Sequence, residues 1–151
     1  MLASGQWLHD NERWAIVHDL QTNKTLFFDG HVPDGAATTS IGLTSDAGTF
    51  VTSTREGPLH FIRTASGEHI LTGNYVDDEL VVWDRNGYFS ATAEGSQFVF
   101  LKFPSLSGYL SFKQFAETLQ RPDVIKDVLA GKPAPPAASL SPPPRLDMRA
   151  A

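Results

Sequence analysis

The histidines are the first side chains of this sequence that could carry out chemistry, because imidazoles bind metals and transfer protons. None of them stands in the His-x-x-His or His-Glu-x-x-His spacing that brings two imidazoles to one metal ion; they lie at positions 9, 18, 31, 60 and 69. The chain has no cysteine, which excludes disulfides, thiolate metal ligands and a cysteine nucleophile. The sequence therefore predicts neither a metal site nor a bound cofactor.

The carboxylates are the second candidates for chemistry. Asp77, Asp78 and Glu79 form the one acidic cluster, but neighbours in an extended chain point to opposite sides, which favours a solvated loop. The run Asp84–Gly87 begins like a calcium loop and lacks the glycine at position six and the glutamate at position twelve. No Gly-x-Ser-x-Gly motif and no phosphate-binding glycine loop occurs. We therefore expect a protein that is not an enzyme; a hydrolase whose acids or histidines converge in a cleft is a distant third alternative.

The composition and charge of the chain indicate which kinds of partner it can bind. The net charge of −5 and the absence of any basic run argue against nucleic acid, which requires a concentrated basic surface. No run of 18 apolar residues is present to cross a membrane. The opening MLASGQWLHD has neither the basic start nor the apolar middle of a signal peptide. These features predict a cytoplasmic protein whose partners are proteins.

The chain changes character twice, which predicts three regions. Residues 1–104 are short β-like runs separated by Gly, Asp, Asn and Thr, residues 105–131 have helical periodicity, and residues 132–151 are rich in proline. Proline lacks the N–H that ladders and helices need, so we expect the last region to be an extended, disordered linker or tail. A linker implies a further domain, of which the closing PPRLDMRAA would be the beginning.

Two short helices are expected in the second region. Ser111 and Gln114 make a capping box ahead of the first helix. Phe112, Phe115 and Leu119 recur at the spacing of one apolar helix face. Such faces usually pack against their own domain, here over a sheet edge, and the alternative is that they dock a neighbouring domain. The second helix is expected to begin at Pro122 and end at Gly131, with an apolar face made of Val124, Ile125, Val128 and Leu129.

An internal period runs through the β-like region. The segment His18–His31 aligns with Phe61–Asn74 at an offset of 43, and Ser45–Thr54 aligns with Asp84–Ala93 at an offset of 39. Periods of about 40 to 45 residues with four short strands are typical of a β-propeller blade. The alignment therefore predicts blade-like repeats of antiparallel strands.

The stretch IVHDLQTNKTLFFDGH resembles the closing half of a WD-repeat blade, in which a strand ending in Trp-Asp is followed by a turn, a second strand and a Gly-His pair. His18-Asp19 takes the Trp-Asp position and Gly30-His31 the Gly-His position, with the turn at residues 22–24. The stretch ATTSIGLTSDAGTFVTSTREGPLHFI resembles the first three strands of the next blade. The strands that this resemblance implies are Thr39–Leu43, Phe50–Thr54 and Leu59–Ile62, with a hairpin turn at Ser45–Gly48.

The second repeat departs from the family pattern. Phe61-Ile62 stands where Trp-Asp would, and Gly73-Asn74 stands where Gly-His would. The hydrogen-bond network of the family therefore cannot form in its usual shape in that repeat. The opening MLASGQ matches the second strand of a preceding blade, so we expect the chain to begin inside a blade and to lack its innermost strand and earlier blades.

A literal Trp-Asp pair, Trp83-Asp84, lies ten residues after Gly73. We interpret ELVVWD as the innermost strand of a further blade, followed by a tight turn at Asn86-Gly87. The residues from there to position 125 resemble a segment of bacterial multidomain proteins that closes a WD-repeat propeller and leads through a proline-rich linker to further domains. Caspase-like peptidase domains are frequent companions in such proteins, but a chain without cysteine cannot perform that cleavage.

The predicted fold is mainly β, with about two and a half four-stranded antiparallel propeller-type blades, a C-terminal helical cap and a proline-rich tail. A propeller needs at least four blades to close, so we expect self-association or further blades, with a homo-oligomer favoured. A small sandwich of the two sheets under the helices is the other arrangement that would cover their apolar faces.

The predicted function is a non-catalytic scaffold or protein-interaction module of the WD-repeat type. The alternative is a self-assembling or small-ligand-binding β protein, which a buried cavity lined by Trp14, Trp83 and phenylalanines would favour. The residues assigned to the structural motif are His18, Asp19, Gly30, His31 and Gly73, and those assigned to a candidate interaction surface are Phe112, Phe115 and Trp83.

Overall fold

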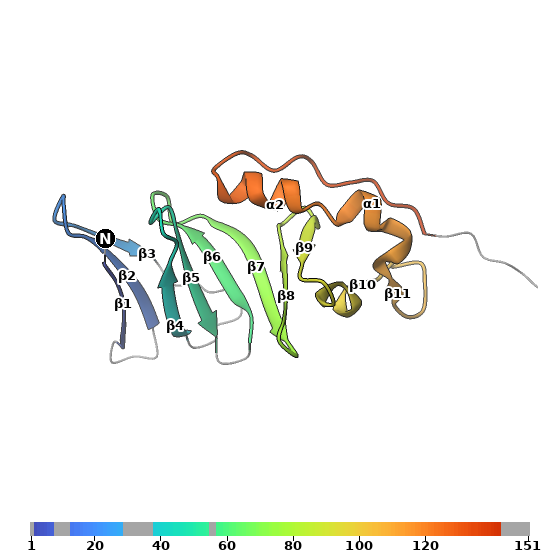
Figure 1. The fold of residues 1–151 in the computed structure, drawn as a ribbon, viewed down its shortest axis with the longest axis horizontal. Helices are drawn as coiled ribbons and strands as arrows, with labels where there is room; N and C mark the ends of the chain where they lie inside the picture. The colour runs from blue at the N-terminus through green and yellow to red at the C-terminus, as the bar shows by residue number, and fades with distance from the viewer. Residues whose placement is uncertain (1, 8–12, 29–37, 55–56, 143–151) are drawn as a thin grey trace, which may run out of the picture.

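The computed structural model describes residues 2–7, 13–28, 38–54 and 57–142. Within these ranges the strands form antiparallel sheets of three, six and two strands, accompanied by two short α-helices (Figure 1). The mainly-β prediction is confirmed, because a chain of short runs separated by turn residues pairs each strand with the next. The grouping differs from sets of four strands, and the reason lies in the turn between β7 (His69–Val76) and β8 (Glu79–Trp83).

The first sheet has the order β1-β2-β3, with β1 at Leu2–Trp7, β2 at Arg13–Asp19 and β3 at Lys24–Phe28. Asp19 shapes the β2–β3 turn, because its carboxylate accepts hydrogen bonds from the Gln21 N–H (3.0 Å) and the Thr22 hydroxyl (2.6 Å). Asn23 then takes a left-handed conformation with φ of 52°, which asparagine tolerates. The turn spans residues 20–23, close to the predicted position.

The second sheet is a six-stranded meander in which each strand pairs with its neighbour in sequence. The turn between β4 and β5 occupies the predicted position, because the Asp46 carboxylate accepts from the Gly48 N–H (3.0 Å) and the Thr44 hydroxyl (2.6 Å). The strands are β4 Thr38–Leu43, β5 Thr49–Thr54, β6 Leu59–Arg63, β7 His69–Val76, β8 Glu79–Trp83 and β9 Phe89–Ala91.

The β7–β8 connection corrects two predictions. Asp77 and Asp78 both have positive φ, 50° and 65°, and form a two-residue turn of the kind that joins hairpin strands. Glu79 is therefore the first residue of β8, as the interpretation of ELVVWD as a strand predicted, and only Asp77 and Asp78 of the acidic cluster form the turn. Because two residues cannot cross to another sheet, β8 pairs directly with β7 instead of starting a new blade.

The tight turn expected after Trp83 is present. The Asp84 carboxylate accepts hydrogen bonds from the N–H groups of Asn86 and Tyr88, each at 2.9 Å. Gly87 completes the turn with φ of 86°, which glycine adopts without the cost of a Cβ. The turn leads from β8 into β9 within the same sheet.

The C-terminal part begins with a 3₁₀ turn η1 at Gly95–Phe98 and a two-stranded sheet, β10 Phe100–Leu101 and β11 Leu110–Ser111. The helix predicted from Ser111 starts as a 3₁₀ turn, η2 Phe112–Phe115, and continues as α1 Ala116–Leu119. The Ser111 hydroxyl caps this turn by accepting from the Lys113 N–H (3.4 Å), so the capping partner differs from the predicted Gln114. The second helix, α2 Pro122–Leu129, has proline at its first turn and is followed by Gly131 with φ of 90°, as expected.

Helix α2 packs on one face of the six-stranded sheet, over the part formed by β7, β8 and β9 (Figure 1). The cluster that it forms with the sheet consists of Ile70, Leu71, Val82, Tyr88, Val124, Ile125 and Val128.

The opposite face of this sheet is covered at both ends. Val82 contributes to the α2 cluster and Val81 to a different one, because neighbours in a strand point to opposite faces. At the β4–β6 end, Val17 of β2 packs on Phe50. At the β8–β9 end, the cluster consists of Phe89, Phe112 and Leu119.

Phe112 is therefore a core residue, which corrects its assignment to an interaction surface. Its side chain is 5% exposed and meets Phe89 edge-to-face, with ring centroids 5.3 Å apart. Phe115 is half-buried and its ring lies 5.7 Å from that of Phe103. The apolar helix face is buried because it gains more by covering its own sheet than by facing water.

The proline-rich region was expected to be a disordered tail, but residues 132–142, here named the strap, lie against the fold. The strap runs back along α2 and α1 as an extended segment (Figure 1). Ala134, Ala138 and Leu140 pack against the core clusters. The rest of the region, residues 143–151, lies outside the described residues.

Candidate functional site

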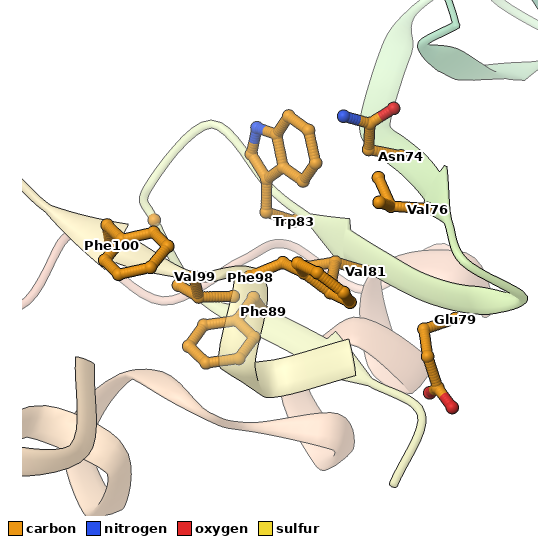
Figure 2. A pocket seen from close by; sticks show the side chains of 10 residues that line it. Asn74, Val76, Glu79, Val81, Trp83, Phe89, Phe98, Val99 and Phe100 are labelled. Carbon is orange, nitrogen blue, oxygen red and sulfur yellow. The ribbon is translucent and has the colours of Figure 1, made fainter. Parts of the chain in front are cut away.

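An open groove lies on the sheet face opposite α2, between the two covered ends. We name it the aromatic groove; its volume is about 310 Å³. Figure 2 shows side chains from β7, β8, β9 and the segment around η1 converging on it. The residues that carry its chemistry are Val76, Val81, Trp83, Phe89, Phe98 and Phe100, with Asn74 and Glu79 as its polar members.

Strand register explains why these residues share one face. Asn74 pairs with Val81, and Trp83 pairs with Phe89. Directly opposite residues in an antiparallel pair point the same way, and residues two apart in one strand do so too. The alternation of β7 and β8 therefore places these side chains together above the sheet. Trp83, which the sequence assigned to an interaction surface, lies in this groove.

The far wall of the groove is carried by the segment that follows β9. Glu79 anchors this segment, because its carboxylate accepts hydrogen bonds from the Thr92 hydroxyl and the Glu94 N–H. The Thr92 hydroxyl oxygen in turn accepts from the Leu80 N–H at 2.9 Å. At Gly95 a Cβ would lie 2.9 Å from the Leu80 carbonyl, so only glycine permits this close approach. These contacts position Phe98 and Phe100 beside the sheet.

The groove leaves aromatic surface in water. Phe100 is 59% exposed and Phe98 is 36% exposed, whereas Phe89 at the floor is buried. Phe98 and Phe100 are two residues apart in the run QFVFLKF, and that alternation was the signal that could have found them in the sequence. The sequence alone did not place them beside Trp83.

A second cavity, of about 280 Å³, lies on the α2 side of the sheet and carries both signs of charge. Asp84, 3% exposed, lines it and its Oδ2 has no hydrogen-bond partner among the described residues. Arg63 donates to the Val128 carbonyl at the end of α2 (3.0 Å). Arg85 and strap residues also line this cavity, but no nucleophile is paired with a base.

Two of the histidines meet on the sheet. His60 Nδ1 and His69 Nε2 are 3.3 Å apart, and the Thr72 hydroxyl oxygen is also 3.3 Å from His69 Nε2. Partial burial of the imidazole lowers the pKa of His69, although much of its side chain remains exposed. No group of three or more metal-ligating side chains occurs among the described residues.

The residues assigned to the WD-like motif are partly described. His18 Nδ1 lies 2.8 Å from the Thr25 hydroxyl oxygen across the β2–β3 hairpin. Gly73 lies in β7, where a Cβ would approach the Phe61 ring to 3.3 Å. Gly30 and His31 lie outside the described residues, as does the side chain of Trp14.

Comparison with known proteins found no matching family model, no matching curated protein and no matching solved structure. The resemblance to WD repeats therefore remains a prediction from the sequence. In the part of the chain that the structure describes, no helix has the length and apolar character needed to cross a membrane.

Proposed function

We propose that this chain is a non-catalytic protein-interaction module of the WD-repeat type, whose contact surface is the aromatic groove and whose partner is a second copy of the chain. The observation that carries the proposal is the exposure of Phe98 and Phe100 beside Trp83 on a sheet face that is covered on either side. Contiguous aromatic surface of this kind marks sites of protein contact.

The same sheet face supports the choice of a β-rich partner. At its β4–β6 end the first sheet packs over it, with Val17 against Phe50. Sheets that pack face to face bury their inner side chains in this way. A second copy supplies such a surface without any other protein.

A two-fold contact between the grooves of two copies fits the available side chains. In such a contact the same patch serves both partners, so Phe100 of each copy packs beside Trp83 of the other. Aromatic residues in a desolvated centre contribute most of the binding free energy of protein interfaces. Glu79 and Asn74 stay at the polar end of the contact.

The test is the molar mass in solution, measured by light scattering behind a sizing column over a range of concentrations. We expect a concentration-dependent dimer, and we expect Phe100→Ser to raise its dissociation constant by about thirtyfold, as loss of an aromatic anchor does. Leu20→Ser is the control, because Leu20 is similarly exposed, at 63%, in the β2–β3 turn. A wild-type monomer at every concentration would refute self-association.

Binding of a small apolar ligand is the second candidate function. The groove volume of about 310 Å³ lies at the lower end of the range for small-molecule sites, and Asn74 offers an amide that could orient a ligand. The same experiment discriminates the two functions. A monomer whose tryptophan fluorescence responds saturably to an apolar probe, with the response lost in Trp83→Phe and in Phe100→Ser, would favour the ligand.

A further inference from the structure

Two side-chain hydrogen-bond donors bind backbone carbonyl groups of the strap. The Asn86 side-chain amide donates to the Pro135 carbonyl at 2.7 Å, and the Tyr88 hydroxyl donates to the Pro136 carbonyl at 2.8 Å. Proline has no N–H, so its carbonyl is the one backbone group through which it can be recognised. Hydrogen bonds to carbonyls of an extended proline-rich chain are a general way of binding polyproline II segments.

The apolar contacts of the strap are shallow. Ala134 and Ala138 pack on the α2 cluster, and Leu140 packs on the cluster around Phe89. All three are half-buried, and no residue of the strap is fully buried. The strap therefore lies on the surface in the manner of a bound peptide, rather than forming part of the core.

The two donors are fixed by the fold beneath the strap. Tyr88 is a buried member of the α2 cluster, and its hydroxyl donates to the strap. The turn that carries Asn86 is held by the Asp84 carboxylate, which accepts the N–H groups of both residues. Neither contact involves the strap, so the recognition surface is organised in advance of binding.

From this geometry we propose that the surface around Asn86 and Tyr88 is a recognition site for an extended proline-rich segment of another protein, and that the strap occupies it in cis. Gly131, with φ of 90°, is the hinge at which the strap leaves α2. The site is distinct from the aromatic groove, which lies on the opposite face of the sheet. Release of the strap would expose it.

A foreign segment can bind more tightly than the strap because of the second cavity. Ala134 lines that cavity of about 280 Å³ and fills little of it. A longer side chain at the same position would enter the cavity and bury additional methylene groups. A second copy offers the same alanine and gains no contact over the strap in cis, which is why the proposal commits to another protein.

The test uses the full chain with a weakened strap. Replacing Pro135 and Pro136 by glycine keeps both carbonyls but raises the conformational freedom that the strap loses on binding. A fluorescent synthetic peptide with the sequence KPAPPAASLSP, residues 132–142, serves as the probe. We expect it to bind this variant roughly fivefold more tightly than wild type, whose strap competes at a high effective concentration.

The site itself is tested by removing the donors. In a full-length chain whose strap residues 134–140 are all replaced by glycine and serine, so that the strap no longer competes with the probe, Tyr88→Phe and Asn86→Ala should each weaken peptide binding about fivefold, the effect of one hydrogen bond. Tyr109→Phe is the matched control, because Tyr109 is 68% exposed and its ring lies against the Lys102 ammonium. A peptide with glutamine at the Ala134 position should bind roughly fourfold more tightly, since it buries one further methylene.

Three outcomes would overturn the proposal. The first concerns a weakened-strap chain whose circular dichroism is that of wild type. If the probe binds this chain no more tightly than a scrambled peptide of the same composition does, the proposal fails. The second is that Tyr88→Phe has the same effect as Tyr109→Phe. The third is a dimer that forms by strap exchange, lost in Tyr88→Phe and retained in Phe100→Ser, which would make the occupant a second copy.

Discussion

At the scale of single residues, aspartates at turns organise this chain. Asp19, Asp46 and Asp84 each accept the N–H of the residue two positions later. The hydroxyls of Thr22 and Thr44, together with these N–H groups, lower the pKa of Asp19 and Asp46. Because the side chain satisfies backbone donors that the turn leaves free, each aspartate fixes where one strand ends and the next begins.

The His69 imidazole makes the stability of the fold depend on pH. Burial lowers its pKa in the folded protein below the ordinary value of 6.5, so the unfolded chain binds more protons just below that pH. Above pH 6.5 the titration of His69 should therefore not reduce the free energy of unfolding. Below pH 6.5 the free energy of unfolding should fall as the pH drops. Urea unfolding at pH values from 5 to 8 measures this slope.

His69→Gln is the matched control for that slope. Glutamine keeps a hydrogen-bonding group near His60 and Thr72 but does not titrate. The difference between wild type and variant reports His69 together with its contact to His60, and we expect the variant to lose less stability on acidification. Equal slopes in the two proteins would contradict the prediction.

At the scale of elements, the connections decide how the strands are grouped. A two-residue turn at Asp77-Asp78 makes β7 and β8 a hairpin. The longer segment after β9 does not form a hairpin with β9. It leaves the six-stranded sheet, and its elements η1 and β10 form one wall of the aromatic groove. The groove therefore depends on a loop whose position is set by few contacts.

Gly95→Ala tests that dependence. The new Cβ would lie 2.9 Å from the Leu80 carbonyl and from the Thr92 hydroxyl oxygen, so the segment must shift. We expect a loss of about 1 to 3 kcal/mol in the free energy of unfolding, the usual cost of overpacking, and a change in tryptophan fluorescence that is absent when Trp83 is replaced by phenylalanine.

Gly42→Ala is the control for Gly95→Ala, since nothing lies within 4 Å of the position that its Cβ would take. We expect it to leave both the unfolding transition and the fluorescence close to those of wild type. Equal effects of the two substitutions would show that steric contact at Gly95 is not what positions the segment.

At the scale of the whole molecule, the described residues of the first and second sheets meet in an apolar cluster. Val17 and Phe50 are both fully buried, with Ile41, Leu43 and Ile62 around them. Clusters of this kind couple the unfolding of the elements that share them. The strap and α2 provide a separate cluster on the opposite face.

Phe50→Ala should therefore uncouple the two sheets. Truncation of a buried phenylalanine costs about 3 to 5 kcal/mol, measurable by urea unfolding. Hydrogen exchange should show that amides of β2 lose protection more than amides of β7. Tyr75→Ala is the control, because Tyr75 is an aromatic residue of β7 that is largely exposed. Equal loss of protection in β2 and β7 would mean that the sheets unfold together.

The hairpins and the second helix of this protein could be predicted from the amino-acid sequence alone. Alternating apolar residues and turn residues predicted the hairpins of β2–β3, β4–β5 and β8–β9, and the proline and glycine at the ends of α2 predicted that helix. These features depend on neighbours within a few residues, such as Asp84 and the N–H groups that follow it. Local hydrogen bonding and backbone preference are sufficient to specify them.

Which apolar surfaces are covered depends on the packing of segments that are distant in the sequence, and it is seen in the tertiary structure alone. An apolar pattern indicates that the side chains of Phe112 and Trp83 are favoured in buried positions, but it does not identify the residues that would cover them. The fold buries Phe112 on Phe89 and leaves Trp83 in an open groove with Phe100. It also seats the strap on Asn86 and Tyr88, some 48 residues earlier in the chain. Packing between distant segments is cooperative and follows from shape and burial together, which the order of residue types does not contain.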